Sequence, residues 1–156
     1  MNITVNLSSF RADLENAADR LYANIEKGVA AGAERIVRAA KRNLKGDARG
    51  KHLVTSIHSE VKPVFGGYVV GKVGVGGATD IEGDAAEEFG IYVHEGTGIY
   101  SRTGMGRKDV PWFYEDSWGV GHTTSGMQAN PFLENAYNSE AGKVAQIIAR
   151  ALTGGM

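Results

Sequence analysis

The spacing of hydrophobic positions predicts a long helix in the first third of the chain. From Phe10 to Leu44 the apolar residues recur every three or four positions, which is the period of one helical face. Gly28 and Gly32 interrupt this pattern, and each lowers helix stability by about 1 kcal/mol relative to alanine. They predict a bend near Gly28–Gly32, a break into two helices, or a close approach of another helix.

An N-terminal arm of residues 1–9 is predicted to precede this helix. Met1–Leu7 alternates as a short strand would, and Ser8 or Ser9 is placed to cap the helix. The arm has neither a basic leader nor an apolar run long enough for a signal peptide. No stretch of the sequence reaches the roughly 18 apolar residues of a membrane span. We therefore expect a cytoplasmic protein without membrane contact.

The middle of the chain is predicted to form short strands. Alternating apolar residues mark Leu53–Val61, Gly67–Val75 and Phe89–Glu95, with a hairpin turn at Gly66-Gly67. Residues 96–126 show little periodicity and are rich in glycine and aromatic residues. A connection of this length in a small domain is usually functional or becomes ordered on assembly. The sequence therefore predicts a small antiparallel sheet with a long loop.

A second helix is predicted at the C-terminal end. Asn130 can cap it, Pro131 suits its first turn, and an apolar stripe runs from Leu133 to Leu152 before Gly154-Gly155. The expected fold is α+β in a single domain of residues 1–156, with this helix packed on the sheet.

Composition narrows the chemistry that the chain can perform. The chain has 156 residues with 22 glycines and no cysteine, and its net charge is −1. The absence of cysteine excludes disulfides, thiolate zinc sites and a cysteine nucleophile. The near-neutral charge gives no global attraction to nucleic acid or to acidic membranes. No phosphate-binding or metal-ligand spacing stands out, so the sequence predicts no cofactor and no metal.

Charge is segregated along the chain even though it cancels overall. Seven cations lie between Glu34 and Lys51: Arg35, Arg38, Lys41, Arg42, Lys45, Arg49 and Lys51. Six anions and no cation lie between Ala78 and Gly96: Asp80, Glu82, Asp84, Glu87, Glu88 and Glu95. Three interpretations remain open, namely solvated surfaces, complementary patches on neighbouring copies, and non-specific contact of the basic face with DNA passing through a channel.

His94 and Glu95 are the residues that most resemble a catalytic pair. Adjacent residues on a strand point to opposite faces, so on the predicted strand they would not share one site. An alternative hypothesis of a small hydrolase or nuclease requires His94, Glu95 and His122 to converge in one pocket. The expectation is that the protein is not an enzyme and has no catalytic residues.

Four segments, in order, resemble one protein family. They are AAKRNLKGDARGKHLVTSI (39–57), EFGIYVHEGTG (88–98), VPWFYEDSWG (110–119) and HTTSGMQANPFLENAY (122–137). Together they resemble the neck, or tail-completion, proteins that join heads to tails in long-tailed bacteriophages. The positions that match the family pattern are Gly50, Leu53, Ser56, Ile57, Tyr92, Glu95, Gly96, Thr97, Gly126, Pro131, Phe132 and Leu133. Where members often have Ala-Pro before the first glycine, this chain has Lys-Gly-Asp-Ala-Arg.

The resemblance implies a structural virion protein that forms a ring in the phage neck, at the head–tail junction. Its expected partners are copies of itself, in a hexamer or dodecamer ring, and the adjacent connector and tail-terminator or tail-tube proteins. Assembly would take place in the cytoplasm of the bacterial host. A minor capsid protein and a tail-terminator protein remain structural alternatives.

The long loop is the predicted contact surface of this subunit. Its candidate interface residues are Arg102, Arg107, Lys108, Trp112, Phe113, Tyr114 and Trp118. Gly96 and Thr97 are expected to end a strand ahead of the loop, and Phe132 and Leu133 to fasten the last helix to the sheet. Deletion of 101–108 is expected to leave folding intact but to impair assembly.

Overall fold

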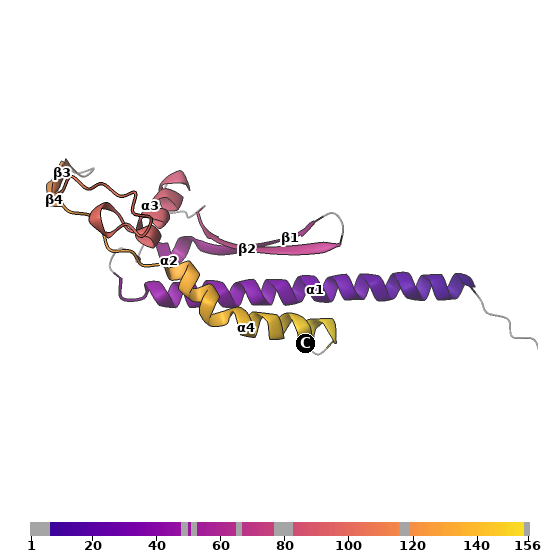
Figure 1. Ribbon diagram of the computed structural model, residues 1–156. Coiled ribbons are helices and arrows are strands. Elements are labelled where there is room, and N and C mark those ends of the chain that lie inside the picture. Colours follow the sequence, from indigo (N-terminus) through magenta and orange to yellow (C-terminus); the bar gives the residue numbers. More distant parts are fainter. Residues whose placement is uncertain are drawn as a thin grey trace, which may run out of the picture. The chain divides into compact units, whose positions relative to one another are not determined.

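The computed structural model describes residues 7–47, 50, 53–64, 67–76, 83–115 and 119–154 (Figure 1). Its elements in chain order are α1 (Leu7–Leu44), α2 (Leu53–Ser56), β1 (Ile57–Val64), β2 (Tyr68–Val75), α3 (Gly83–Glu95), the short 3-10 helix η2 (Gly98–Tyr100), β3 (Trp112–Glu115), β4 (Gly121–Thr124) and α4 (Phe132–Leu152). The strands form two antiparallel sheets, β1–β2 and β3–β4. The predicted α+β class is confirmed.

The chain divides into two compact units. The first contains Met1–Arg35, Ser59–Lys72 and Ala141–Met156, and the second contains Ile36–His58 and Val73–Glu140. Helices α1 and α4 and strands β1 and β2 each begin in one unit and end in the other.

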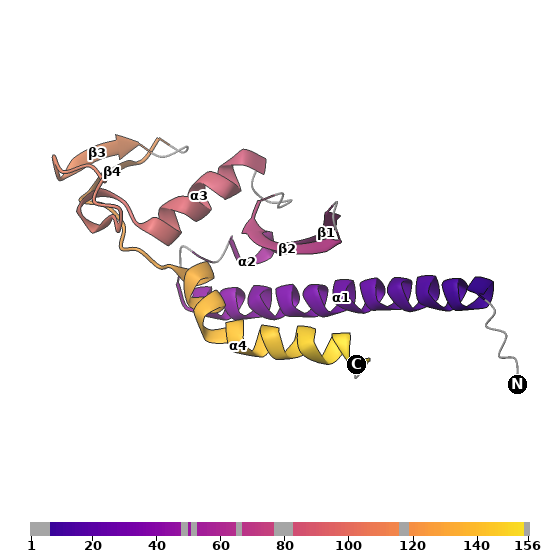
Figure 2. The same ribbon diagram turned by 45° about the vertical axis from the view of Figure 1, so that its right-hand side comes forward.

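In the first unit, α1 and α4 pack against each other along two glycines of α1. A Cβ atom on Gly28 would lie 2.7 Å from Ala151 Cβ, and one on Gly32 would lie 2.8 Å from Val144 Cγ1. The later residue of α1, Gly32, faces the earlier residue of α4, Val144, so the two helices run antiparallel (Figures 1 and 2). The prediction of a break at these glycines is wrong, and the prediction of a close helix approach is confirmed.

The β1–β2 hairpin packs on α1 within the same unit. A Cβ atom on Gly71 would lie 2.8 Å from Val29 Cγ1, and Ser59 Oγ donates a hydrogen bond of 2.6 Å to Glu34 Oε1. The turn contains Gly67, whose φ of +84° favours glycine. The predicted turn is thus confirmed at Gly67, while Gly66 lies outside the described residues.

The second unit holds the main hydrophobic core. Side chains from α1, α2, α3 and α4, together with the first residue of β1, meet there. The buried members are Val37, Ala39, Ala40, Leu44, Leu53, Ile57, Val93, Phe132 and Ala136. Asn43 Nδ2 donates a hydrogen bond of 3.0 Å to Phe132 O, which joins the end of α1 to the start of α4. Phe132 therefore anchors α4 mainly among helices, with Val73 and Val75 of β2 at the edge of the core.

The predicted strand Phe89–Glu95 is wrong, because this segment is the second half of helix α3. Gly90 and Val93 are buried whereas Ile91 and Tyr92 are exposed, which is the pattern of one helical face and not of a strand. Gly90 lets α3 approach β2, because a Cβ atom there would lie 3.1 Å from Val75 Cγ1.

The first predicted strand is also partly wrong. Leu53–Ser56 forms the short helix α2, in which Ser56 Oγ donates to Leu53 O at 2.9 Å, and β1 begins only at Ile57. The predicted strand Gly67–Val75 is confirmed as β2, which begins at Tyr68.

The predicted helix boundaries also need correction. Because α1 begins at Leu7, Ser8 and Ser9 lie inside the helix and do not cap it, and residues 1–6 lie outside the described residues. The side-chain amide of Asn130, the predicted cap of α4, donates to Asp47 Oδ2 at 3.1 Å, and α4 begins two residues later at Phe132. No helix in the described part of the chain is long and apolar enough to cross a membrane.

Candidate interaction surface

The predicted loop 96–126 begins at a glycine that ends α3. The backbone N–H of Gly96 donates to Tyr92 O at 2.9 Å, and its φ is +75°, so it adopts the left-handed conformation common after a helix. Gly96 therefore ends a helix instead of the predicted strand. Beyond it, Thr97 N donates to Met127 O at 2.9 Å, and Met127 N donates to Thr97 Oγ1 at the same distance.

Two glycines let the start and the end of this segment cross in close contact. A Cβ atom on Gly98 would overlap Ser125 O, and one on Gly126 would overlap Thr97 O. Both glycines have positive φ, +59° and +117°, so substitution would add backbone strain to the overlap. The predicted long loop 96–126 is therefore closed at its base, and its described residues include η2, β3 and β4.

Arg102 ties the segment to two helices of the second unit. Its backbone N–H donates to Glu95 O at 2.9 Å, at the end of α3. Its Nη2 donates to Glu134 Oε2 in the first turn of α4 at 2.7 Å. Arg102 is a predicted interface residue, but these contacts give it a role within the subunit. Deletion of 101–108 would remove them, so single substitutions are the better test of assembly.

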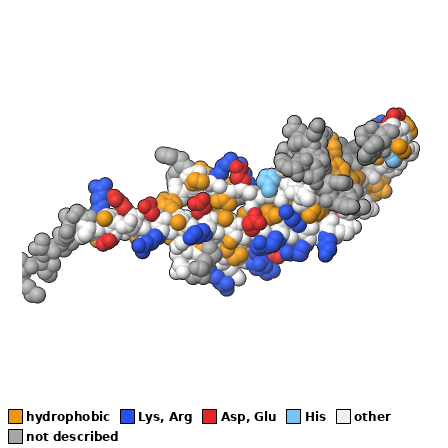
Figure 3. All heavy atoms as spheres, turned by 180° about the vertical axis from the view of Figure 1, so that it is seen from behind, with side chains coloured by type: hydrophobic (Ala, Val, Ile, Leu, Met, Phe, Trp, Pro, Cys, Tyr) orange, Lys and Arg blue, Asp and Glu red, His pale blue; other side chains and the backbone are white. Residues whose placement is uncertain are grey.

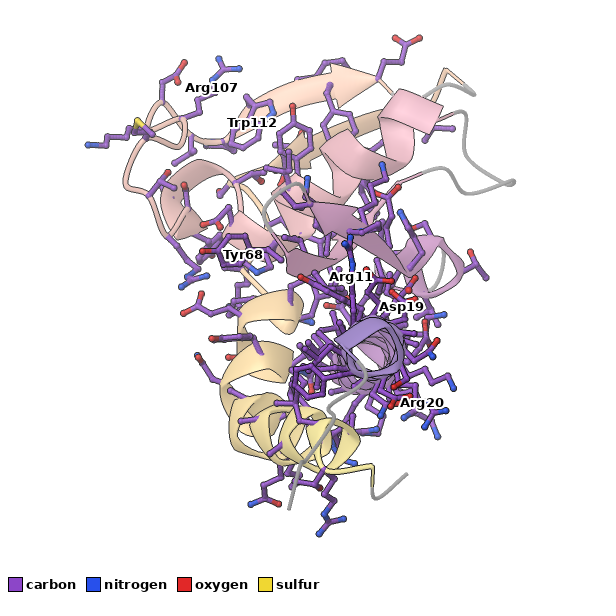
Figure 4. All side chains as sticks on the ribbon, turned by 90° about the vertical axis from the view of Figure 1, so that its right-hand side faces the viewer. Arg11, Asp19, Arg20, Tyr68, Arg107 and Trp112 are labelled. Atoms are coloured by element: carbon purple, nitrogen blue, oxygen red, sulfur yellow. The ribbon has the colours of Figure 1, made fainter. Side chains whose placement is uncertain are left out.

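Arg107, Asp109 and Trp112 form a second group of contacts. The guanidinium of Arg107 donates to both carboxylate oxygens of Asp109, at 2.7 and 2.8 Å, and lies 5.4 Å from the centroid of the Trp112 ring (Figure 4). The hydrogen bond between the side chains raises the pKa of Arg107 and lowers the pKa of Asp109. The sequence reasoning missed Asp109, although the Arg-x-Asp spacing could have indicated it.

The β3–β4 hairpin carries the predicted aromatic contacts. Its register pairs Trp112 with Thr124 and Tyr114 with His122. The rings of Tyr114 and His122 stack with centroids 5.1 Å apart and an interplanar angle of 25°. Phe113, on the opposite face, is 68% exposed. A two-stranded hairpin is marginally stable on its own, so an exposed aromatic face is a site where a partner would add stability.

Large apolar side chains are unusually exposed in this region. Among the described residues between 91 and 120, eight large apolar side chains are exposed: Ile91, Tyr92, Ile99, Tyr100, Met105, Phe113, Tyr114 and Val120. Three of them, Ile91, Tyr92 and Met105, line one hollow, and exposed apolar side chains that gather in this way are typical of protein–protein contact sites. We call these eight side chains the apolar contact surface. The sequence analysis named only two of them, Phe113 and Tyr114, as contact residues, because exposure depends on packing that the local pattern does not record.

Three further predicted interface residues lie in segment 96–126. Lys108 is exposed, and Trp112 is partly buried. Trp118 lies outside the described residues.

His94 and Glu95 line a mainly apolar hollow of about 270 Å³ in the second unit, between α3, β2 and the start of α4. His94 Nδ1 lies 2.9 Å from Glu95 Oε1, so the prediction that the two side chains point apart is wrong. The His94 ring meets the Phe132 ring edge-on, with centroids 5.5 Å apart. His122 does not line this hollow, so the structure brings together two of the three side chains that the hydrolase hypothesis requires.

The residues that carry the family resemblance serve mainly as packing and turn devices. Leu53, Ile57 and Phe132 are buried in the core, and a Cβ atom on Gly50 would lie 2.9 Å from Leu44 Cδ2. Gly96, Thr97 and Gly126 hold the base of segment 96–126. Pro131 O accepts the first helical hydrogen bond of α4, from Asn135 N at 2.9 Å.

Comparison with protein-family models, with curated proteins and with solved structures gives no match. Within the described ranges no group of His, Asp and Glu side chains could hold a metal ion. The candidate site combines exposed apolar side chains with a base that Gly98 and Gly126 close.

Proposed function

We propose that this chain is a structural, non-enzymatic subunit of the neck of a tailed bacteriophage, at the head–tail junction of the virion. The observation that carries the proposal is that the separated segments of the resemblance converge in the second unit. Leu53, Val93 and Phe132, from three of those segments, share one core. Thr97 and Met127 exchange two hydrogen bonds. The segments of the resemblance thus share one core, as the parts of a single family architecture would.

The apolar contact surface gives this proposal its mechanism. In a ring of six or twelve copies, the exposed side chains of the β3–β4 hairpin and of segment 96–105 would be covered by a neighbouring copy or by the connector and tail proteins. Burial of apolar surface at about 25 cal/mol per Å² would then drive assembly, and the marginal hairpin would be stabilised at the same time. On this proposal the subunit acts by contact and requires no chemistry at His94 and Glu95.

The basic stretch of α1 has a secondary place in the proposal. Arg38, Arg42 and Lys45 are exposed, and Arg42 lies 3.4 Å from Glu140. Their spacing places them on one helical face, opposite the buried Ala40 and Leu44. In a ring around a channel, this face would make non-specific contact with the phosphates of passing DNA.

The proposal is tested by complementation. Inactivation of the gene should leave filled heads and complete tails that do not join, as seen by electron microscopy. The native chain supplied in trans should restore joined particles, whereas Phe113→Ser should not. Tyr137→Ser is the matched control, because Tyr137 is 60% exposed on α4, outside the apolar contact surface. Both variants should keep the native circular dichroism spectrum.

The outcome also separates the alternatives. Tails of uncontrolled length after gene inactivation would indicate a tail-terminator protein, and defective heads would indicate a minor capsid protein. Normal joined particles without the gene would contradict the neck assignment.

A further inference from the structure

The N-terminal part of α1 extends beyond the elements that cover the rest of that helix in the first unit. The contact with α4 reaches Gly28, opposite Ala151 near the end of α4, and the hairpin turn at Gly67 reaches Tyr22. Residues 9–23 are all exposed. About three and a half turns of helix, roughly 20 Å over residues 9–21, therefore lie past the described parts of α4 and the hairpin (Figures 1 and 2).

This uncovered part carries an apolar stripe on the same face of α1 that contacts α4 farther along the helix. Phe10 and Leu14 precede Gly28 and Gly32 by about five whole helical turns, so they lie on the same face of α1. Phe10 and Leu14 are 56% and 55% exposed, and Leu21 between them and the glycines is 44% exposed. Hydrophobic side chains appear among charged ones along this part of the helix (Figure 3).

The stripe has the spacing of a two-helix contact. Phe10, Leu14, Ala17 and Leu21 follow steps of four, three and four, which is the repeat that brings one helix against another. A helix of this length is marginal in water without a partner. We propose that the occupant of this face is the same segment of a second copy of this chain, packed antiparallel.

The charges beside the stripe select the antiparallel arrangement. Asp13 and Arg20 lie two turns apart on one flank of the stripe. A two-fold axis midway between Leu14 and Ala17 sets Leu14 against Ala17 of the second copy. It also sets Asp13 opposite Arg20, and this pair of opposite charges occurs twice in the dimer.

A parallel pair lacks this match. In that arrangement Asp13 would face Ala18 and Arg20 would face Ile25 of the other copy, with no pairing of opposite charges. The antiparallel pair is isologous, so it is a contact of a different kind from the ring contacts proposed above. It rests on α1 alone, and it can hold or fail independently of the neck role.

The first test measures self-association by sedimentation equilibrium over a micromolar to millimolar concentration series. The native chain should form dimers. Asp13→Arg and Arg20→Asp should each weaken the dimer by about tenfold, because each turns two attractions into repulsions. The double variant D13R/R20D should restore dimerisation. Asp19→Arg is the matched control, with the same charge change on the side of α1 away from the stripe (Figure 4), and it should dimerise like the native chain.

The second test uses the absence of native cysteine. Mixed Leu14→Cys and Ala17→Cys chains should form a disulfide across the pair, and should do so faster than either variant alone. Faster cross-linking of Leu14→Cys with itself would overturn the antiparallel arrangement. A native chain that stays monomeric, or failure of the double charge swap to restore dimers, would overturn the proposal. Circular dichroism confirms that each variant retains its helix.

Discussion

Replacing Gly28 of α1 by alanine should destabilise the protein, although the same change stabilises most helices. An alanine in a helix interior is favoured over glycine by about 1 kcal/mol. At Gly28, however, the new Cβ would lie 2.7 Å from Ala151 Cβ and 3.3 Å from Ile148 Cα, which is a backbone atom. Overpacking of this kind costs about 1–3 kcal/mol, so the net change should lie between about 0 and 2 kcal/mol of lost stability.

Gly142 on α4 provides the matched control. It is exposed, and a Cβ atom there would have nothing within 4 Å, so Gly142→Ala should stabilise by about 1 kcal/mol. The two variants should therefore differ by about 1–3 kcal/mol in urea unfolding followed by circular dichroism. At this chain length that difference corresponds to a gap in Tm of several degrees, at about 2–4 °C per kcal/mol.

A double-mutant cycle identifies the cause of the effect. Ala151→Gly removes the atom that the new methyl group meets, so the pair G28A/A151G should show a favourable coupling energy. If Gly28→Ala were as stabilising as Gly142→Ala, or if the cycle showed no coupling, the close contact of α1 and α4 would be refuted.

Two further predictions concern the segment 96–126. Gly98→Ala should lower the free energy of unfolding by about 2 kcal/mol or more, because φ is +59° and the methyl group would overlap Ser125 O; a neutral result in urea unfolding would contradict the crossing. The Asp109–Arg107 pair should open in acid. The pKa of Asp109 is lowered in the folded protein. The pair's contribution to stability is therefore present above the ordinary carboxyl pKa, and it is lost as the pH falls through the lowered pKa of Asp109. An NMR titration of the Arg107 Nε–H signal should follow this change and Asp109→Asn should abolish it, whereas an acid-insensitive signal in the native chain would count against the pair.

The sequence predicted the two long helices correctly, because each has a hydrophobic pattern that extends over many turns. The stripe from Phe10 to Leu44 and that from Leu133 to Leu152 both correspond to helices, and long amphipathic periods are hard to satisfy in any other way. The glycines of α1 were harder to interpret, because the residue that packs against Gly28 is Ala151, which lies far away in the sequence.

The wrong predictions concern segments whose hydrophobic pattern is short, or whose secondary structure is determined by tertiary contacts. Phe89–Glu95 offers only seven residues, over which strand and helix patterns overlap, and burial of Gly90 against Val75 favours the helix. Strands β3 and β4 have four residues each, too few for a periodic signal. The crossing of Gly98 and Gly126 is invisible to any local pattern.

The sequence indicated which residues belong to the candidate site better than it indicated which residues they contact. The sequence identified Arg107 and Trp112, which the structure brings together, but it gave no reason to join Arg102 to Glu134. It also placed His94 and Glu95 on opposite faces, an error that followed directly from the wrong element type.

Direct imaging of the head–tail junction tests the central claim. A cryo-electron microscopy map of the virion that contains this chain should show a ring of its copies between the connector and the tail. In that ring, Phe113 and the other side chains of the apolar contact surface should be covered by neighbouring subunits. A junction fully accounted for by other proteins, or density for this chain only in the capsid shell or the tail tube, would contradict the proposal.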